Sequence, residues 1–323
     1  MQQSPGPVIS VIVPSYNKPE YLLECLKSIQ EQTFTDWECI VVSDGSPRVA
    51  EIRAAVVAMH DKRFRLVEHK DNRGLAAARN TGVREARAEL VICVDEDDRI
   101  FPECLKEELK TLEDKDCEVV CCIPEFIGGR SGLYRTRIPS LEEILSSQPL
   151  PPAGFLLKKS AWERLGGWDE HPVLRLGRED HEWWIRAVSE GIKIALIDRA
   201  LYQYRVPAAN DEENSSLNLR ARETEVYIRR YIVQKHAELY RRYPEERRKY
   251  LRNAYLNEAA WYSTHGQLNV ALVRIWQAAA ISKTGKDLRT ALRATIDRVI
   301  GWERAERLLH TRRRFLAAKK IVS

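Results

Sequence analysis

The sequence predicts an α/β protein with a largely parallel sheet in its N-terminal part and helices in its C-terminal part. Up to about residue 124, short apolar runs alternate with segments of helical periodicity, the pattern of βαβ units. Beyond about Arg205 only helical periodicity remains. Three of the apolar runs end in polar clusters, "PSYN", "SDGS" and "DEDD". Because parallel strands end at the same edge of a sheet, we expect these clusters to converge there, where ligands of such sheets bind.

Each predicted strand is a short apolar run that a turn signal or a polar cluster ends. The first, Val8 to Val13, is continuously apolar and stops at Pro14, as buried parallel strands do. The second ends at Asp44-Gly45-Ser46. In order, the predicted strands lie in "VISVIVPSYN", "WECIVVSDGS", "FRLVEH", "ELVICV" and "CEVVCCIP".

The segments between these strands predict helices. The first has Pro19 near its start and apolar residues at helical spacing, Tyr21, Leu22, Cys25, Leu26 and Ile29. The others are "VAEIRAAVVAMH", "NRGLAAARNTGVREARA" and "PECLKEELKTLED". From Gly128 to Pro152 the pattern breaks down, which indicates a loop region. Order resumes in "GFLLKKSAWERLGGWDE" and in "GREDHEWWIRAVSEG", of which the second is mostly helical.

A polar segment at 206–216 indicates a boundary between residues 1–205 and a helical domain at 206–323. We expect a helix break at Pro244 and a single helical hairpin in "NEAAWYSTHGQLNVALVRIWQAAAIS", which resembles one tetratricopeptide-type unit. One copy of such a unit is a hairpin and not a repeat fold.

The composition is that of an ordinary globular protein, with 44% hydrophobic and 31% charged residues among 323. Its net charge of +5 arises at the end of the chain. Residues 283–323 contain twelve Lys or Arg against four Asp or Glu, whereas the rest contains 40 against 43. No apolar run approaches the roughly 20 residues of a membrane span, and no secretory signal is evident. We therefore expect a cytoplasmic protein whose seven cysteines are reduced core thiols.

Two common nucleotide-binding loops are missing from the sequence. Neither GxGxxG nor GxxxxGK[ST] follows the first strand, which argues against a dinucleotide fold and a phosphate loop. The acidic run offers another route to phosphate. Asp95 and Asp97 stand at i and i+2 after a strand, and two such carboxylates can converge on Mg²⁺ or Mn²⁺ that bridges a diphosphate. By itself, the run is more typical of a solvated turn than of a metal site.

Six ordered blocks resemble one known family. They are "ISVIVPSYNKPEYLLECLKSIQEQTF", "ECIVVSDGS", "NRGLAAARNTGV", "VDEDD", "GGWDE" and "GREDHEWWIRAVSEG", spanning residues 8–191. In these blocks the chain is similar to the family 2 inverting nucleotide-sugar glycosyltransferases. The resemblance implies a GT-A fold, a Rossmann-like, mostly parallel mixed sheet flanked by helices, at residues 1–205. It also implies metal-dependent, inverting transfer of a hexosyl-type sugar with Mn²⁺ or Mg²⁺.

The resemblance also implies a donor site. Pro14 and Tyr16 would line the nucleobase, and Asp44 would accept a hydrogen bond from the base imide. Arg79 would lie near the nucleotide, while Asp95 and Asp97 would contact the ribose and the metal-bound diphosphate. Without the family, Tyr16 reads as a core tyrosine, Asp44 as a turn former and Arg79 as a surface charge. Within the acidic run we expect Glu96 to be a spacer, and the role of Asp98 stays open.

On the acceptor side, the resemblance implies Asp180 as the general base and Glu179 as its acidic neighbour near the acceptor. Trp183 and Trp184 are candidates for stacking on a sugar, although one of them is expected in the core. The alternative for Asp180 is a carboxylate at a helix N-terminus, which the helix dipole favours.

The expected donor is a UDP-sugar, or a dTDP-sugar with the same imide. A glycan, a lipid-linked glycan and a peptide or protein remain open as acceptors, and the sugar and the oligomeric state stay undetermined. The competing class is a glycosyltransferase-like module that binds without transfer. A sugar nucleotidyltransferase would need a Gly-rich loop that is absent. The basic end, "RAERLLHTRRRFLAAKK", suits either a solvated helix or peripheral contact with the inner membrane face. We expect no nucleic acid partner.

Overall fold

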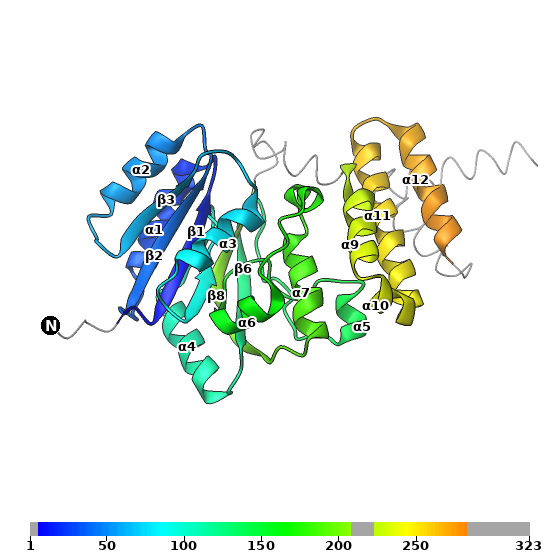
Figure 1. Ribbon diagram of the computed structural model, residues 1–323. Helices are drawn as coiled ribbons and strands as arrows, with labels where there is room; N and C mark the ends of the chain where they lie inside the picture. Colours follow the sequence, from blue (N-terminus) through cyan, green and yellow to red (C-terminus); the bar gives the residue numbers. More distant parts are fainter. Residues whose placement is uncertain (1–5, 208–222, 283–323) are drawn as a thin grey trace, which may run out of the picture. The chain divides into compact units, whose positions relative to one another are not determined.

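The computed structural model describes residues 6–207 and 223–282, which form two compact units (Figure 1). The first unit lies within Met1–Ser215 and the second within Ser216–Ser323. The division falls inside the polar segment 206–216 that the sequence marks as a linker. Each unit is described by itself.

The first unit is built on one eight-stranded sheet with the order β3-β2-β1-β4-β7-β6-β8-β5. Strands β1, β2, β3 and β4 pair in parallel, as do β6 and β8, whereas β7 runs antiparallel to β4 and β6, and β5 antiparallel to β8. The predicted mixed, mostly parallel sheet is thus confirmed. The strands are β1 Ile9–Ser15, β2 Trp37–Asp44, β3 Phe64–His69, β4 Leu90–Cys93, β5 Arg99–Ile100, β6 Val119–Gly128, β7 Phe155–Lys158 and β8 Ile194–Val206.

Helices cover both faces of this sheet. The predicted helices are confirmed as α1 Pro19–Gln30, α2 Val49–Ala58, α3 Leu75–Glu85, α4 Cys104–Asp114 and α7 Glu179–Ser189. Alternate residues of β1 serve the two faces: Val11 and Val13 belong to the core that includes α1, whereas Ile12 faces α3. Gly82 lets α3 lie close to the sheet, because a Cβ there would stand 2.2 Å from Ile12 Cγ2.

The segment 128–152, predicted as a loop region, is held at several points. It contains the short helix α5 Leu141–Ile144, which the Ser140 side chain caps. Tyr134 donates a hydrogen bond to the Gln148 carbonyl at 3.0 Å, and His181 Nε2 lies 2.7 Å from the Ile144 carbonyl oxygen. The first contact holds the segment to itself, and the second attaches it to the start of α7. The remaining elements are α6 Lys159–Leu165 and the 3₁₀ helix η1 Pro172–Leu176.

The second unit is helical, as predicted, in the described residues. Its helices are α9 Glu225–Lys235, α10 Ala237–Arg242, α11 Pro244–Thr264 and α12 Leu268–Ile281. Pro244 stands at the start of α11, where its missing N–H costs nothing. Gly266, with φ 76°, turns the chain between α11 and α12, which confirms the helical hairpin. The basic end of the chain lies outside the described residues.

All seven cysteines are buried and unpaired, as the prediction of core thiols required. Within residues 6–207 and 223–282, no helix combines the length and the apolar character that a membrane crossing needs.

Candidate active site

The three polar clusters meet at the carboxyl edge of the sheet, because β2, β1 and β4 are parallel neighbours. Glu96 ties two of them together. Its carboxylate accepts hydrogen bonds from Ser15 Oγ at 2.5 Å, Tyr16 N at 3.1 Å and Asn17 N at 3.3 Å. Burial raises the pKa of Glu96, although these hydrogen bonds oppose the rise. Glu96 therefore holds the turn that carries Tyr16 and does not point toward the open edge.

Asp98, whose role the sequence left open, is also structural. It is 1% exposed and accepts hydrogen bonds from the Tyr202 hydroxyl at 2.5 Å and from Arg205 N at 2.7 Å. Burial, and then the charges of Asp97 and Asp95, raise its pKa well above the ordinary value. The acidic run thus alternates, with Glu96 and Asp98 turned inward and the other two carboxylates at the surface.

The outward carboxylate of Asp97 faces a lysine from the first loop. Lys18 Nζ lies 2.6 Å from Asp97 Oδ2, and the two side chains are 28% and 19% exposed. Burial by itself would lower the pKa of Lys18, but the charge of Asp97 and the hydrogen bond to it produce a net rise. Arg205 Nε donates to the Asp97 carbonyl oxygen at 2.7 Å. Asp97 is therefore fixed from both sides and still reaches solvent.

Arg79 of α3 lies between Asp95 and Glu179. Its Nη2 is 2.8 Å from Asp95 Oδ1, and its Nη1 is 3.0 Å from Glu179 Oε1. Burial would lower its pKa, but the two carboxylates raise it above the ordinary value. Because Arg79 is 1% exposed, both the surface-charge alternative and a direct contact with the donor disagree with the structure. The guanidinium instead links the end of β4 to the start of α7.

Glu179 and Asp180 form the first turn of α7, after Arg178 in a left-handed conformation with φ 68°. Glu179 is 7% exposed and turned toward Arg79, so the predicted acceptor contact does not fit it. Burial and the neighbouring charge of Asp180, opposed by Arg79, raise the pKa of Glu179 to about 7. Asp180 is half-buried and accepts hydrogen bonds from Gln148 Nε2 and from His181 N. Of this pair, Asp180 is the one that remains accessible.

The two tryptophans proposed for sugar stacking both belong to the core, so that prediction is wrong. Trp183 and Trp184 are each 0% exposed. Trp183 stacks on Trp168 with ring centroids 5.8 Å apart, and Trp184 packs on Phe155 at 4.6 Å. The Trp184 Nε1 donates to the Pro151 carbonyl at 2.9 Å. Because the core encloses both indoles completely, no ring surface is left for a ligand.

Among the residues predicted to bind the base, Asp44 organises a loop. It is 3% exposed; its Oδ1 lies 2.6 Å from His69 Nδ1, and its Oδ2 accepts from Gly74 N at 2.7 Å. A base imide would have to share these oxygens. Pro14 is buried in β1, whereas Tyr16 is half-buried at the strand end.

Sequence reasoning missed Lys18 and Gln148. A lysine directly after "PSYN" is a usable signal, because an acidic run at the same sheet edge needs counter-charge. For Gln148 the sequence offers no such signal, because its contact with Asp180 depends on the path of a long connection.

The carboxylates at this sheet edge could hold a hard divalent cation only together with ligands from a substrate or from water. Asp95 and Asp97 are oxygen ligands of the kind that Mg²⁺ and Mn²⁺ prefer, and both are about one-fifth exposed. In the described part of the chain, no group of three or more His, Cys, Asp or Glu side chains is arranged to hold a metal ion. A cation here would therefore need further ligands from phosphate and water.

Comparisons with known structures agree with this architecture. The S. aureus TarS fragment 1–349 in complex with UDP-GlcNAc aligns with a TM-score of 0.56 at 20% identity, over 90% of this chain and 81% of that one. A mannosyltransferase from Pyrobaculum calidifontis, in complex with GDP-Man and Mn²⁺, aligns with a TM-score of 0.58 at 21% identity, over 91% and 81%. These likenesses show the GT-A fold.

Sequence relatives cover parts of the chain. The putative glycosyltransferase EpsH of Bacillus subtilis is 37% identical over 115 residues, 36% of this chain and 33% of the relative. The uncharacterized glycosyltransferase EpsJ of the same organism is 38% identical over 217 residues, 62% of this chain and 61% of the relative. The chain thus spans a third to three-fifths of the length of these relatives. The family model described as glycosyl transferase family 2 matches residues 10–184. This match covers more than half of the chain, which therefore belongs to glycosyl transferase family 2.

Proposed function

We propose that this protein is an inverting, metal-dependent glycosyltransferase that moves a sugar from a nucleoside diphosphate sugar to an acceptor hydroxyl. The observation that carries the proposal is a pair of ion-pair sets at one sheet edge: Lys18 pairs with Asp97, and Arg79 pairs with both Asp95 and Glu179. Arg79 thereby links one accessible carboxylate at the end of β4 to the first turn of α7, where Asp180 follows Glu179. Donor and acceptor chemistry both need such groups, and they stand on elements packed around one sheet edge.

On the donor side, Asp95 and Asp97 would hold Mn²⁺ or Mg²⁺ together with the diphosphate. When bound, the cation supplies positive charge that stabilises the departing diphosphate. Lys18 lies against Asp97 and can contribute to the same stabilisation. Arg79 is a positioning residue, because it holds Asp95 in place without reaching solvent. Tyr16, on the turn that Glu96 fixes, offers a face for the base.

On the acceptor side, Asp180 would be the general base. The acceptor oxygen attacks C1 of the sugar while Asp180 takes its proton. The bond from C1 to the phosphate oxygen breaks, and the nucleoside diphosphate leaves with the electron pair. A single displacement of this kind inverts the anomeric centre, through a transition state with oxocarbenium character. Gln148 would orient Asp180 through its hydrogen bond to Oδ2.

For the donor we favour a UDP-sugar, with a dTDP-sugar as the second choice, since both present the same imide to Asp44. One structural relative is in complex with UDP-GlcNAc and another with GDP-Man, so a test panel needs both purines and pyrimidines. A glycan, a lipid-linked glycan and a peptide or protein remain the candidate acceptors. We place the protein in the cytoplasm.

The test is release of nucleoside diphosphate from UDP-, dTDP- and GDP-sugars by the full chain with Mn²⁺, Mg²⁺ or EDTA. We expect one donor to be turned over with metal only. Asp180→Asn should lower kcat about 100-fold or more while nucleotide binding persists. Asp97→Asn should weaken metal-dependent binding as well. The exposed Asp114→Asn, at the end of α4, is the matched control and should behave like wild type.

Two outcomes would overturn the proposal. Full activity in both Asp97→Asn and Asp180→Asn would remove the site assignment. Tight nucleotide-sugar binding without turnover over a broad acceptor panel would identify a binding module instead. The anomeric configuration of the first product, read by NMR, tests inversion separately.

A further inference from the structure

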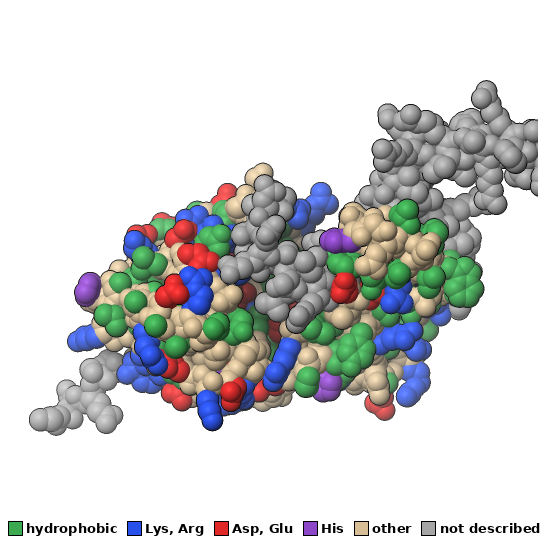
Figure 2. Space-filling view, turned by 90° about the horizontal axis from the view of Figure 1, so that it is seen from above, with side chains coloured by type: hydrophobic (Ala, Val, Ile, Leu, Met, Phe, Trp, Pro, Cys, Tyr) green, Lys and Arg blue, Asp and Glu red, His purple; other side chains and the backbone are tan. Residues whose placement is uncertain are grey.

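The outer face of α12 is apolar. Leu268, Leu272 and Trp276 follow one another at i, i+4 and i+8, and Val273 lies beside them. Their side chains are 56%, 63%, 72% and 53% exposed, in that order. We call these four residues the α12 apolar face. Hydrophobic side chains gather over this unit in Figure 2, with Lys and Arg side chains beside them.

The inner face of α12 uses small residues instead. Ala271 and Ala278 are its buried positions, and Ala278 packs with Val226, Ala254 and Tyr255. The single charged residue of the helix, Arg274, lies 2.7 Å from Glu258 Oε2 of α11. A helix whose outer face is exposed only to water normally carries its large apolar residues on the inner face. Here they point outward, which indicates that another apolar surface covers them.

The size of the α12 apolar face limits what can cover it. The four side chains expose on the order of 500 Å², a patch size that often marks an interaction site. A stable protein dimer needs about 800 Å² per partner, so this face by itself is too small for one. No helix in the described ranges is fit to span a bilayer. A helix with an exposed tryptophan and leucines can, however, lie in the headgroup region of a membrane.

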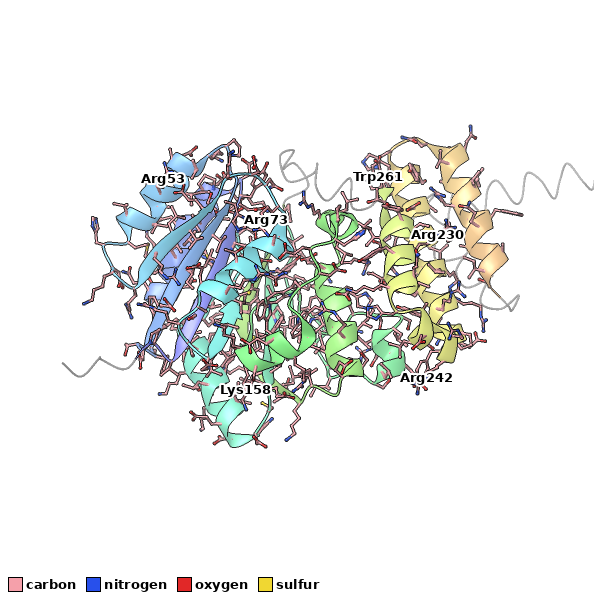
Figure 3. All side chains as sticks on the ribbon, viewed as in Figure 1. Arg53, Arg73, Lys158, Arg230, Arg242 and Trp261 are labelled. Atoms are coloured by element: carbon pink, nitrogen blue, oxygen red, sulfur yellow. The ribbon has the colours of Figure 1, made fainter. Side chains whose placement is uncertain are left out.

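The surrounding charge favours an anionic surface. Residues 223–282 contain ten Lys or Arg against six Asp or Glu, and residues 283–323, which continue from α12, contain twelve against four. Arg241, Arg242, Arg247 and Lys249 are exposed at the end of α10 and the start of α11. Figure 3 shows Arg242 at the end of the unit where α11 begins. Because α11 and α12 form a hairpin, this is also the end where α12 finishes.

We propose that the α12 apolar face docks this protein onto an anionic lipid bilayer. In this arrangement α12 lies in the interface, and the exposed basic residues Arg241, Arg242, Arg247 and Lys249 face the headgroups. The two contributions are complementary. One lipid chain or one short apolar face gives marginal binding, whereas an apolar face combined with a polybasic segment gives stable attachment. The α12 apolar face belongs to the second unit and the residues of the proposed sugar-transfer site belong to the first, so the docking proposal does not rest on that function.

The experiment measures co-sedimentation of the full chain with vesicles of phosphatidylcholine alone or with about 30% phosphatidylglycerol, a fraction large enough to give an anionic surface. We expect binding to the anionic vesicles only, weakened several-fold by salt near 0.5 M. Leu272→Gln with Trp276→Ser should weaken it about tenfold or more. The control is Val57→Ser, whose valine is 70% exposed on α2, and it should bind like wild type. Neither variant should lose thermal stability or donor turnover.

Four results would overturn the proposal. Unchanged binding of the double variant would exclude the α12 apolar face, and equal binding to neutral vesicles would exclude charge recognition. Absence of vesicle binding, with a dimer that the double variant dissociates, would identify a second copy as the partner. Absence of vesicle binding with a lower Tm for the double variant would mean that the chain covers its own face.

Discussion

Glu179 links the stability of the fold to pH through its burial at the candidate site. Its pKa of about 7 compares with an ordinary value of 4.5, because burial and Asp180 outweigh the attraction of Arg79. The native state therefore binds this proton more tightly than the unfolded state does. For such a carboxyl the stabilisation is complete below about pH 4.5 and is lost as pH rises through about 7. Glu179→Gln removes the titrating group and keeps an oxygen that can accept from Arg79 Nη1.

The size of the pH effect on the unfolding free energy follows from the raised pKa of Glu179. The difference between about 7 and 4.5, at about 1.4 kcal/mol per pKa unit, amounts to about 3.5 kcal/mol over the whole titration. Relative to Glu179→Gln, wild type should therefore lose roughly 2 to 3 kcal/mol of unfolding free energy between pH 5 and pH 8. The assay is urea unfolding at several pH values. The control is Glu190→Gln, an exposed residue directly after α7, for which the difference from wild type should not change with pH.

A constant difference between wild type and Glu179→Gln over that pH range would refute the reasoning. It would mean that Glu179 is ionised in the native state throughout, and that the ion pair with Arg79 outweighs burial. The contact at 3.0 Å would then be worth more than the desolvation of both groups.

Three further substitutions test individual contacts. Trp183→Ala should lower the unfolding free energy by about 3 to 5 kcal/mol, measured by urea unfolding, whereas Trp183→Phe should cost less; an unaffected stability would contradict its place in the core. Tyr202→Phe removes the hydroxyl that donates to Asp98 and should cost about 1 to 3 kcal/mol in the same assay, and no loss would mean that water replaces the hydroxyl. Glu96→Ala frees the Ser15–Asn17 turn and should raise the KM for the donor about tenfold, the equivalent of one lost charged hydrogen bond, with kcat less affected; an unchanged KM would separate that turn from donor binding.

Much of the fold was predictable because periodicity marks elements that bury one face. Strand β1 and helix α7 were both readable in this way. Strand β8 was not, since its 13 residues include the exposed Asp198 and Arg199 at an irregular stretch of its pairing with β6. Strand β7 was missed as a strand because four residues are too few to establish an alternation. Its antiparallel direction depends on contacts on both sides of it, which sequence periodicity does not report.

For the candidate site, sequence order indicated which side chains gather but not which way they point. The four acids of the run are nearly identical in chemistry. Their directions are decided by partners far away in the chain: Ser15 for Glu96, and Tyr202 for Asp98. The tryptophans illustrate the same limit. A pair of indoles suggests stacking on a sugar, yet Trp168 and Phe155 enclose both.

The arrangement also explains how so dense an acidic run is tolerated at the end of a buried strand. The two inward acids have raised pKa values and hydrogen-bond donors, so their charge is small or well solvated by the protein. The two outward acids each face a cation, Lys18 for Asp97 and Arg79 for Asp95. These cations differ in their freedom. Arg79 is buried and fixed by Glu179, whereas Lys18 is 28% exposed on a flexible stem. Lys18 can therefore leave Asp97 more easily than Arg79 can leave Asp95. Asp95 and Asp97 are the residues that would hold a divalent cation, and Lys18 would add positive charge beside them.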